Sequence, residues 1–201
     1  AARLQGGSLA HPLGTDTFGR DTLTWVMVGA RITLLVGVVA VGIALLIGTP
    51  IGIISALFAK QPWGMWIDAV IMRANDILLA FPALLLAIIF AAVYSPGTGP
   101  AMVAVGIAAI PGFARVARSG TLQVLGSEYV RAARASNRRI PAIAFVHVLP
   151  NIAGMVIVQA SVAFAISVLA EAGLSFLGLG TQAPTPSWGR MLQESQQYLS
   201  T

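Results

Sequence analysis

The stretch ITLLVGVVAVGIALLIGTPIGIISALFA, residues 32–59, decides the fold, because it carries no charge between Arg31 and Lys60. As an α-helix it would extend about 40 Å at roughly 1.5 Å per residue. That length exceeds the hydrocarbon core of a bilayer, which is about 30 Å thick. We therefore expect the first membrane span of this chain here.

Further apolar segments predict three more spans. A cluster of turn-forming residues, Ser-Pro-Gly-Thr-Gly-Pro at 95–100, divides a long uncharged segment in two. The resulting spans cover about 78–94 and 100–117, and another apolar segment predicts a span over about 150–172. Four spans place both ends of this chain on one side of the membrane.

The composition agrees with a membrane protein. Hydrophobic residues make up 57% of the chain and charged residues only 9%, and the mean hydropathy is +0.83. A water-soluble core does not need so many apolar residues. We expect an all-α, polytopic helical bundle. The absence of cysteine excludes disulfides, thiolate metal sites and cysteine nucleophiles.

Lysine and arginine are divided unequally between the two sides of the membrane. The richer side carries Lys60, Arg73, Arg115, Arg118, Arg131, Arg134, Arg138 and Arg139. The poorer side carries Arg3, Arg20, Arg31 and Arg190. By the positive-inside rule, the loops at 60–76 and 118–149 are cytoplasmic. The segments 1–31, with an interfacial helix, and 173–201 are then external. The net charge of +5 reflects this topology and does not indicate nucleic-acid binding.

The segment EYVRAARASNRRIPAIAFVHVLPN, residues 128–151, is an amphipathic stretch between the apolar spans. Residues 128–135 have helix-forming composition, and helical spacing gathers one compact face of Tyr129, Ala132, Ala133 and Ser136. Asn137 stands where the chain must turn, since asparagine tolerates the left-handed conformation. Pro141 suits the first turn of a second helix. One interpretation is an interfacial helix with snorkelling arginines; another is a docking surface for a partner.

The sequence contains no pattern that supports an enzymatic function. His11 and His147 fall on opposite sides of the predicted membrane and cannot share a metal ion. No phosphate-binding glycine loop ending in Lys-Ser or Lys-Thr occurs. A dinucleotide-like pattern at 178–183 lacks the strand and helix that such a motif requires. We predict no catalytic, cofactor-binding or metal-binding residue.

Glu171 is a carboxylate near the outer end of the last predicted span. An ionisable group at such a position is costly unless it faces protein or water, and it is often functional. Glu171 could line or gate a translocation path. It could equally anchor the glycine-rich bend at 173–180 by hydrogen bonds.

The amphipathic segment resembles the cytoplasmic EAA loop of ABC importer permeases, which reads E-A-A, three residues, glycine, then a distal I-x-L-P. Arg131-Ala132-Ala133 corresponds to the opening and Val148-Leu149-Pro150-Asn151 to the close. This chain departs from the pattern in two places. Arg131 replaces the acidic residue, and Asn137 stands at the glycine position.

Two more blocks resemble the dipeptide, oligopeptide and nickel subfamily of these permeases. They are the external block at 11–21 with Gly-Ala-Arg at 29–31, and the block at 170–180 with Ala-Pro-Thr-Pro-Ser-Trp-Gly at 183–189. The subfamily normally has six spans in the type I permease fold, with one further span at each end. The resemblance implies that this chain is a fragment, with a transmembrane domain over residues 32–201.

The resemblance implies a multi-pass permease subunit of the cell membrane, surrounded by lipid and without nucleic acid. It would pair with a homologous second permease, two cytoplasmic ATPases and an external solute-binding protein. The ATPases would bind ATP and Mg²⁺, and this chain would hold no cofactor. The residues expected to couple it to the ATPases are Tyr129, Arg131, Ala132, Ala133, Arg134 and Asn137.

Three functions stay open at this stage. The first is the import of small peptides. The second is the same architecture importing nickel or another chelated small solute, although no cluster of imidazoles or thiolates that would chelate nickel occurs. The third is a passive channel or a membrane scaffold. Association with an ATPase would separate the first two from the third.

Overall fold

The computed structural model describes residues 3–59, 61 and 63–196, which form helices and loops without a β-strand. The helices are α1 (Thr22–Ala59), α2 (Gly64–Ala80), α3 (Ala83–Tyr94), α4 (Thr98–Leu125), α5 (Glu128–Ala135), α6 (Ile140–Ile143), the π-helical turn η1 (Ala144–Val148), α7 (Leu149–Phe176) and α8 (Trp188–Ser195).

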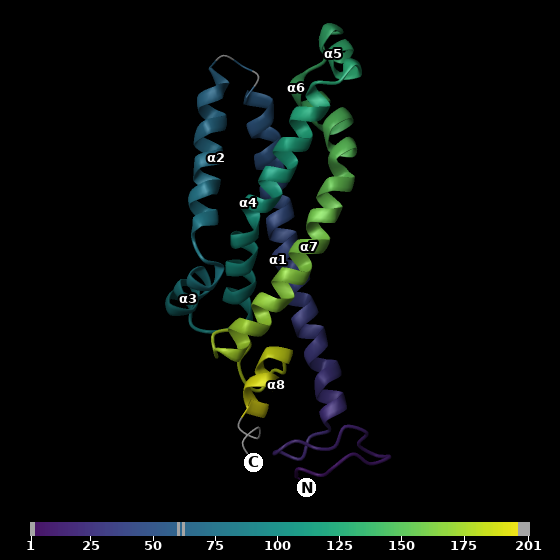
Figure 1. Cartoon of the computed structure of the whole chain (residues 1–201), viewed down its shortest axis with the longest axis vertical. Helices are drawn as coiled ribbons and strands as arrows, with labels where there is room; N and C mark the ends of the chain where they lie inside the picture. The colour runs from purple at the N-terminus through teal and green to yellow at the C-terminus, as the bar shows by residue number, and fades with distance from the viewer. Residues whose placement is uncertain (1–2, 60, 62, 197–201) are drawn as a thin grey trace.

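The long helices α1, α4 and α7 run along the long axis of the molecule, with α2 beside them (Figure 1). Helices α5 and α6 lie at one end, which we call the α5 end. Helix α8 and the described residues nearest both termini lie at the other end, the α8 end. Among the described residues, three helical stretches are long and apolar enough to cross a membrane, or four if the bent pair α2 and α3 counts as one span. The prediction of an all-helical bundle with about four spans is therefore confirmed.

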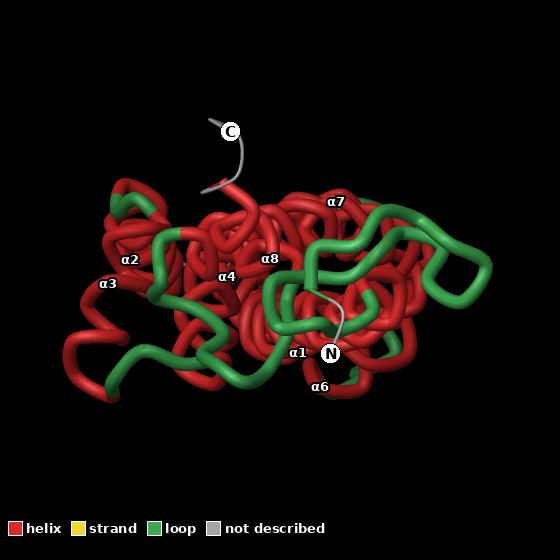
Figure 2. Tube along the Cα trace, turned by 90° about the horizontal axis from the view of Figure 1, so that it is seen from below, coloured by secondary structure: helices red, strands yellow, loops and turns green. Residues whose placement is uncertain are grey.

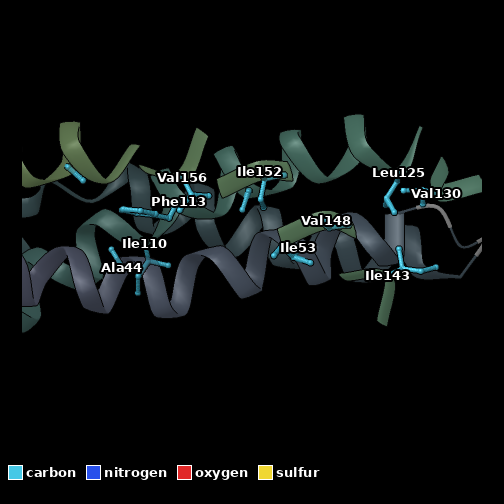
Figure 3. Close-up of a cluster of buried hydrophobic side chains, with 12 residues drawn as sticks. Ala44, Ile53, Ile110, Phe113, Leu125, Val130, Ile143, Val148, Ile152 and Val156 are labelled. Atoms are coloured by element: carbon cyan, nitrogen blue, oxygen red, sulfur yellow. The ribbon is translucent and has the colours of Figure 1, made fainter. Parts of the chain in front are cut away.

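Buried side chains from α1, α4 and α7 form the main core (Figure 3). Ala44 of α1, Phe113 of α4 and Val156 of α7 belong to one cluster of buried residues. Close approach of α1 and α4 depends on a missing side chain at Gly48, where an added Cβ would lie 2.6 Å from the carbonyl oxygen of Ile110. Small residues at such contacts let membrane helices pack closely.

The first span begins earlier than the sequence predicted. Helix α1 starts at Thr22, so residues 22–31, expected in an external segment with a separate interfacial helix, are its first turns. The carboxylate of Asp21 explains this start, because it accepts a hydrogen bond of 2.9 Å from the backbone N–H of Thr24. This contact satisfies one of the free donors at the helix N-terminus.

The bounds predicted for the second span, 78–94, were wrong, because the bent pair α2 and α3 covers 64–94. Helix α2 occupies Gly64–Ala80, mostly within the predicted loop, and the chain then bends by 83° into the short helix α3. The bend falls at Phe81-Pro82, because proline disfavours helix in the residue before it and lacks a backbone donor. The turn predicted at 95–100 is confirmed, since α3 ends at Tyr94 and α4 begins at Thr98.

The third predicted span, 100–117, was too short at its C-terminal end. Helix α4 continues to Leu125, so the connection that contains α5 is shorter than the predicted loop at 118–149. The charges of Arg115 and Arg118 do not end the helix, because each guanidinium pairs with a carboxylate on α2. The last predicted span, 150–172, agrees closely with α7.

Candidate coupling site

Helix α5 is a short amphipathic helix at one end of the bundle. Its buried residue is Val130, which belongs to the same core cluster as Leu125 of α4 and Ile143 of α6 (Figure 3). Glu128 lies in the first turn of the helix and Arg134 in the last, and both charges suit the helix dipole. The helix is thus fixed to the bundle mainly by Val130, while most of its surface stays exposed.

The exposed face of α5 contains most of the residues predicted for coupling. Tyr129 is 46% exposed, and Arg131, Ala132, Arg134 and Asn137 are exposed as well. Ala133 differs, because it is half-buried on the side that Val130 turns toward the bundle. The residues predicted to form one face of this helix therefore do not all point outward. Tyr129 and Ala132 are exposed, whereas Ala133 is partly turned toward the bundle.

The end of α5 has the turn predicted at Asn137. This residue has a φ of 55°, in the left-handed region. Its N–H donates to the carbonyl of Arg134, and the N–H of Arg138 donates to the carbonyl of Ala133. These two bonds define a Schellman motif, which commonly ends in glycine or asparagine. Asn137 can therefore replace the glycine of the related pattern without changing the turn.

The connection from α5 to α7 is helical but irregular. Pro141 lies in the first turn of α6, as predicted, and η1 inserts a π-helical turn before α7. The side-chain amide of Asn151 donates to the carbonyl of His147 at 2.6 Å. The rings of Tyr129 and His147 have centroids 5.9 Å apart, so α5 also contacts η1, directly before α7.

The α5 end carries a basic surface. None of the ion pairs found among the described residues involves the arginines at 131, 134, 138 and 139, all of which are exposed. Unpaired guanidinium groups suit carboxylate and phosphate partners. This surface combines exposed positive charge with the small side chain of Ala132. A small side chain would let another protein approach the helix closely.

Glu171 lies toward the α8 end and is completely buried. Its Oε1 accepts hydrogen bonds from the hydroxyls of Ser175 at 2.6 Å and Thr181 at 3.2 Å, and its Oε2 accepts one from Thr33 at 3.1 Å. The carboxylate thereby connects α1, α7 and the loop before α8. In this conformation it does not line an open path.

The segment before α1 forms an ion-paired loop. The carboxylate of Asp16 accepts from the backbone N–H groups of Phe18 and Arg20 and from the guanidinium of Arg20. Burial alone would raise the pKa of Asp16, but these contacts with Arg20 and Phe18 together lower it below its usual value. The guanidinium of Arg20 also lies 3.9 Å from the carboxylate of Glu194 on α8. Figure 2 shows this loop and α8 together at one end of the bundle.

Two ion pairs between α2 and α4 were not predicted from the sequence. Arg118 donates to both carboxylate oxygens of Asp68, at 2.7 and 2.6 Å, and Ser55 of α1 also donates to Asp68. Arg115 donates to Asp76 at 2.5 Å. A signal was present, because Asp68 and Asp76 are about two turns apart on one side of α2. Their partners, however, lie far along the chain.

The fold and this site define a class of protein, a polytopic helical membrane protein of the type I permease fold with an exposed amphipathic helix at one end. The family model described as "Binding-protein-dependent transport system inner membrane component" matches residues 48–201. The chain belongs to this family of inner-membrane transport components.

Curated relatives from several bacteria support the assignment. The chain is 44% identical over 199 residues to the dipeptide transport system permease protein DppC of Alkalihalophilus pseudofirmus, covering 99% of this chain and 64% of that protein. It is 41% identical to DppC of Escherichia coli, covering 96% and 63%. It is 39% identical to the glutathione transport system permease protein GsiD of Pectobacterium atrosepticum, covering 96% and 62%. The chain thus spans less than two thirds of the length of these relatives.

Solved structures confirm the fold. A chain of the MetNI methionine ABC transporter in an inward-facing conformation aligns with a TM-score of 0.73, covering 90% of this chain and 83% of that chain. The two sequences are 19% identical, so this similarity concerns the fold alone.

Proposed function

We propose that this chain is part of a permease subunit of an ATP-driven importer and that α5 is its coupling helix. One observation carries the proposal: α5 exposes Tyr129 and Ala132 to a partner while Val130 is buried in the core shared by α1, α4 and α7. A force applied to α5 would therefore reach the bundle directly. Close-packed interfaces transmit such shifts because they do not deform continuously.

In this mechanism, separate ATPase subunits bind and hydrolyse ATP with Mg²⁺, and this chain does no catalysis. An ATPase that holds α5 and changes shape would move α4 and α7 through the contacts of Val130. A second permease would supply the other half of the path. Alternating access is then a population shift between two packings, biased by ATP and by a loaded external binding protein.

Small peptides are the cargo that we propose. The support is similarity to permeases whose names specify dipeptide and glutathione transport. Nickel or another chelated solute is the nearest variant of the same architecture. A passive channel or scaffold is a different class, and the anchored docking surface of α5 favours the coupled transporter over it.

Glu171 in this proposal holds the outer end of the bundle closed. Its oxygens tie Thr33 of α1 to Ser175 of α7 and to Thr181 in the following loop. Opening this end would require these hydrogen bonds to break together. Glu171 then acts as an anchor of the closed state, which reconciles the gate and anchor hypotheses.

Co-purification tests the coupling role. In the full-length complex, Ala132→Glu places a carboxylate on the exposed face of α5 and is expected to abolish co-purification of the ATPase. Ala10→Glu is the matched control, since Ala10 is also exposed but precedes α1, at the α8 end. Ala133 is less suitable for this test, because it is half-buried. A substitution there could release the ATPase by disturbing the fold and not by blocking the docking surface.

The control is expected to retain the ATPase and the peptide uptake of the unaltered complex. If the Ala132→Glu complex still retained the ATPase, the hypothesis that α5 is the docking surface would be rejected. Uptake of peptide without ATP consumption would favour the channel instead.

A further inference from the structure

An open cavity of about 560 Å³ with five charged side chains in its walls lies between α2 and α4, in a region to which the coupling mechanism assigns no role. Its charged walls are formed by Asp68, Arg73 and Asp76 of α2 and by Arg115 and Arg118 of α4. Binding sites for small molecules have volumes of about 300–1,000 Å³. The cavity is therefore large enough to hold a small solute.

The cavity lies on the side of the bundle, far from the ends of both helices, and its walls are partly exposed. At about 1.5 Å per residue, about 15 Å of helix separate Arg115 from the last residue of α4 and about 18 Å separate Asp76 from the first residue of α2. Charged side chains within a membrane bundle face water, another charge or protein, because contact with hydrocarbon is costly. The cavity must open toward water or a partner subunit.

The opposite face of α2 has the reverse character. Trp66, Val70 and Ile77 are 75%, 66% and 62% exposed, and helical spacing places them opposite Asp68 and Met72. Arg73 starts from the same side as these apolar residues, and its long side chain reaches the cavity wall. This apolar face suits lipid or an apolar protein surface.

The charges in the cavity do not cancel completely. Asp68 pairs with Arg118, and Asp76 pairs with Arg115. Arg73 takes part in none of the ion pairs or hydrogen bonds found among the described residues. Asp76 and Arg115 are 47% and 49% exposed, so their pairing is open to exchange with a charged ligand.

We propose that this cavity is a station of the translocation path that accepts zwitterionic solutes with a free carboxylate and a free ammonium group. Arg73 and Arg115 would receive the carboxylate, since guanidinium groups bind carboxylates with two parallel hydrogen bonds. Asp76 would receive the ammonium group. This inference rests on the proposed peptide import and names the part of the chain that the peptide meets.

Cysteine labelling in the full-length complex in lipid nanodiscs tests the inference, because this sequence contains no cysteine. Met72→Cys places a thiol in the cavity wall, and Val70→Cys places a matched thiol on the apolar face of α2. The probe is a charged methanethiosulfonate reagent, with labelling of this chain followed by mass. Glycyl-leucine at millimolar concentration is the ligand, and its N-acetylated, C-amidated form is the uncharged control.

We expect Met72→Cys to react several-fold faster than Val70→Cys, and glycyl-leucine but not its capped form to slow the reaction. The proposal would be overturned if the two thiols were labelled at equal rates or if both peptides slowed labelling equally. Protection of the Met72→Cys thiol by phosphatidylethanolamine but not by glycyl-leucine would also overturn it. Uptake of glycyl-leucine by the unaltered complex is measured in parallel. If the complex takes up glycyl-leucine but the labelling results contradict the cavity, the proposed import function is retained and only the proposed binding site is rejected.

Discussion

At the residue scale, Glu171 shows how a buried carboxylate is accommodated by hydroxyl groups alone. Among the described residues its side-chain partners are Thr33, Ser175 and Thr181. The cluster extends further, because the hydroxyl of Ser175 accepts from the backbone N–H of Thr181. Removing the carboxylate therefore affects several buried groups at once.

We predict that Glu171→Ala lowers the free energy of unfolding by about 1–3 kcal/mol, because the three hydroxyls lose their common acceptor. Glu171→Gln should cost less, since its amide oxygen still accepts hydrogen bonds and its NH₂ can donate to Thr33. Thermal unfolding in detergent, followed by tryptophan fluorescence, measures the difference. Equal stability of Glu171→Ala and the unaltered protein would contradict the anchoring role.

Asp16 gives a prediction about pH. Its lowered pKa means that the native loop favours the carboxylate, so Asp16 contributes stability above the usual value of 3.8 and loses it as the pH falls through the lowered pKa. An NMR titration of the Asp16 carboxyl carbon should give a midpoint below 3.8, and Arg20→Gln should raise that midpoint. A midpoint at or above the usual value would show that the contacts with Phe18 and Arg20 do not form.

At the scale of single elements, α5 and α2 are held to the bundle in different ways. Helix α5 is attached by the apolar side chain of Val130. Helix α2 buries only Gly64, Asp68 and Asn75 among its residues, so polar contacts rather than an apolar stripe fix its position. Changes in charge should therefore disturb α2 more than α5.

The end of α5 provides a test of backbone conformation. Asn137→Val is predicted to destabilise the turn by about 1–2 kcal/mol, because L-residues with a Cβ disfavour the left-handed region. Asn137→Gly should be tolerated, since glycine adopts this conformation without a steric cost. ATP-driven peptide uptake by the full complex and its thermal stability are the measurements. Equal loss in both variants would indicate that the amide, and not the turn, matters.

The two ion pairs of α2 should contribute unequally. The side chains of Asp68 and Arg118 are 12% and 30% exposed, against 47% and 49% for Asp76 and Arg115. A double-mutant cycle with alanine should give a coupling energy of about 1–3 kcal/mol for the first pair. The second pair serves as the control and should give at most about 1 kcal/mol. Equal coupling energies would contradict the role of Asp68 as the main polar anchor of α2.

The elements that the sequence predicted are those whose signals are local. The uncharged run of α1, the amphipathic pattern of α5 and the turn at Asn137 each depend on neighbouring residues. The course of α2 could not be predicted in the same way, because its charges suggested a loop. The negative charge of Asp68 is neutralised by Arg118, which lies fifty positions further along the chain. Only the tertiary structure brings these two side chains together.

At the scale of the whole molecule, the two ends of the bundle have different constructions. The α5 end presents exposed arginines and small residues, which suit a partner protein. The α8 end is tied together by Glu171 and by the contact of Arg20 with Glu194. A bundle that is bound at one end and closed by hydrogen bonds at the other can respond to force at the first by opening at the second.

Photo-crosslinking from Tyr129 tests the central claim most directly, because this exposed residue lies on the proposed docking face. In the assembled complex, Tyr129 is replaced by benzoylphenylalanine, and Phe18 at the α8 end is replaced in the same way as a control. The account predicts that position 129 forms an adduct with the nucleotide-hydrolysing subunit and that position 18 does not. An adduct from position 129 with lipid or an external protein, and none with that subunit, would contradict the account.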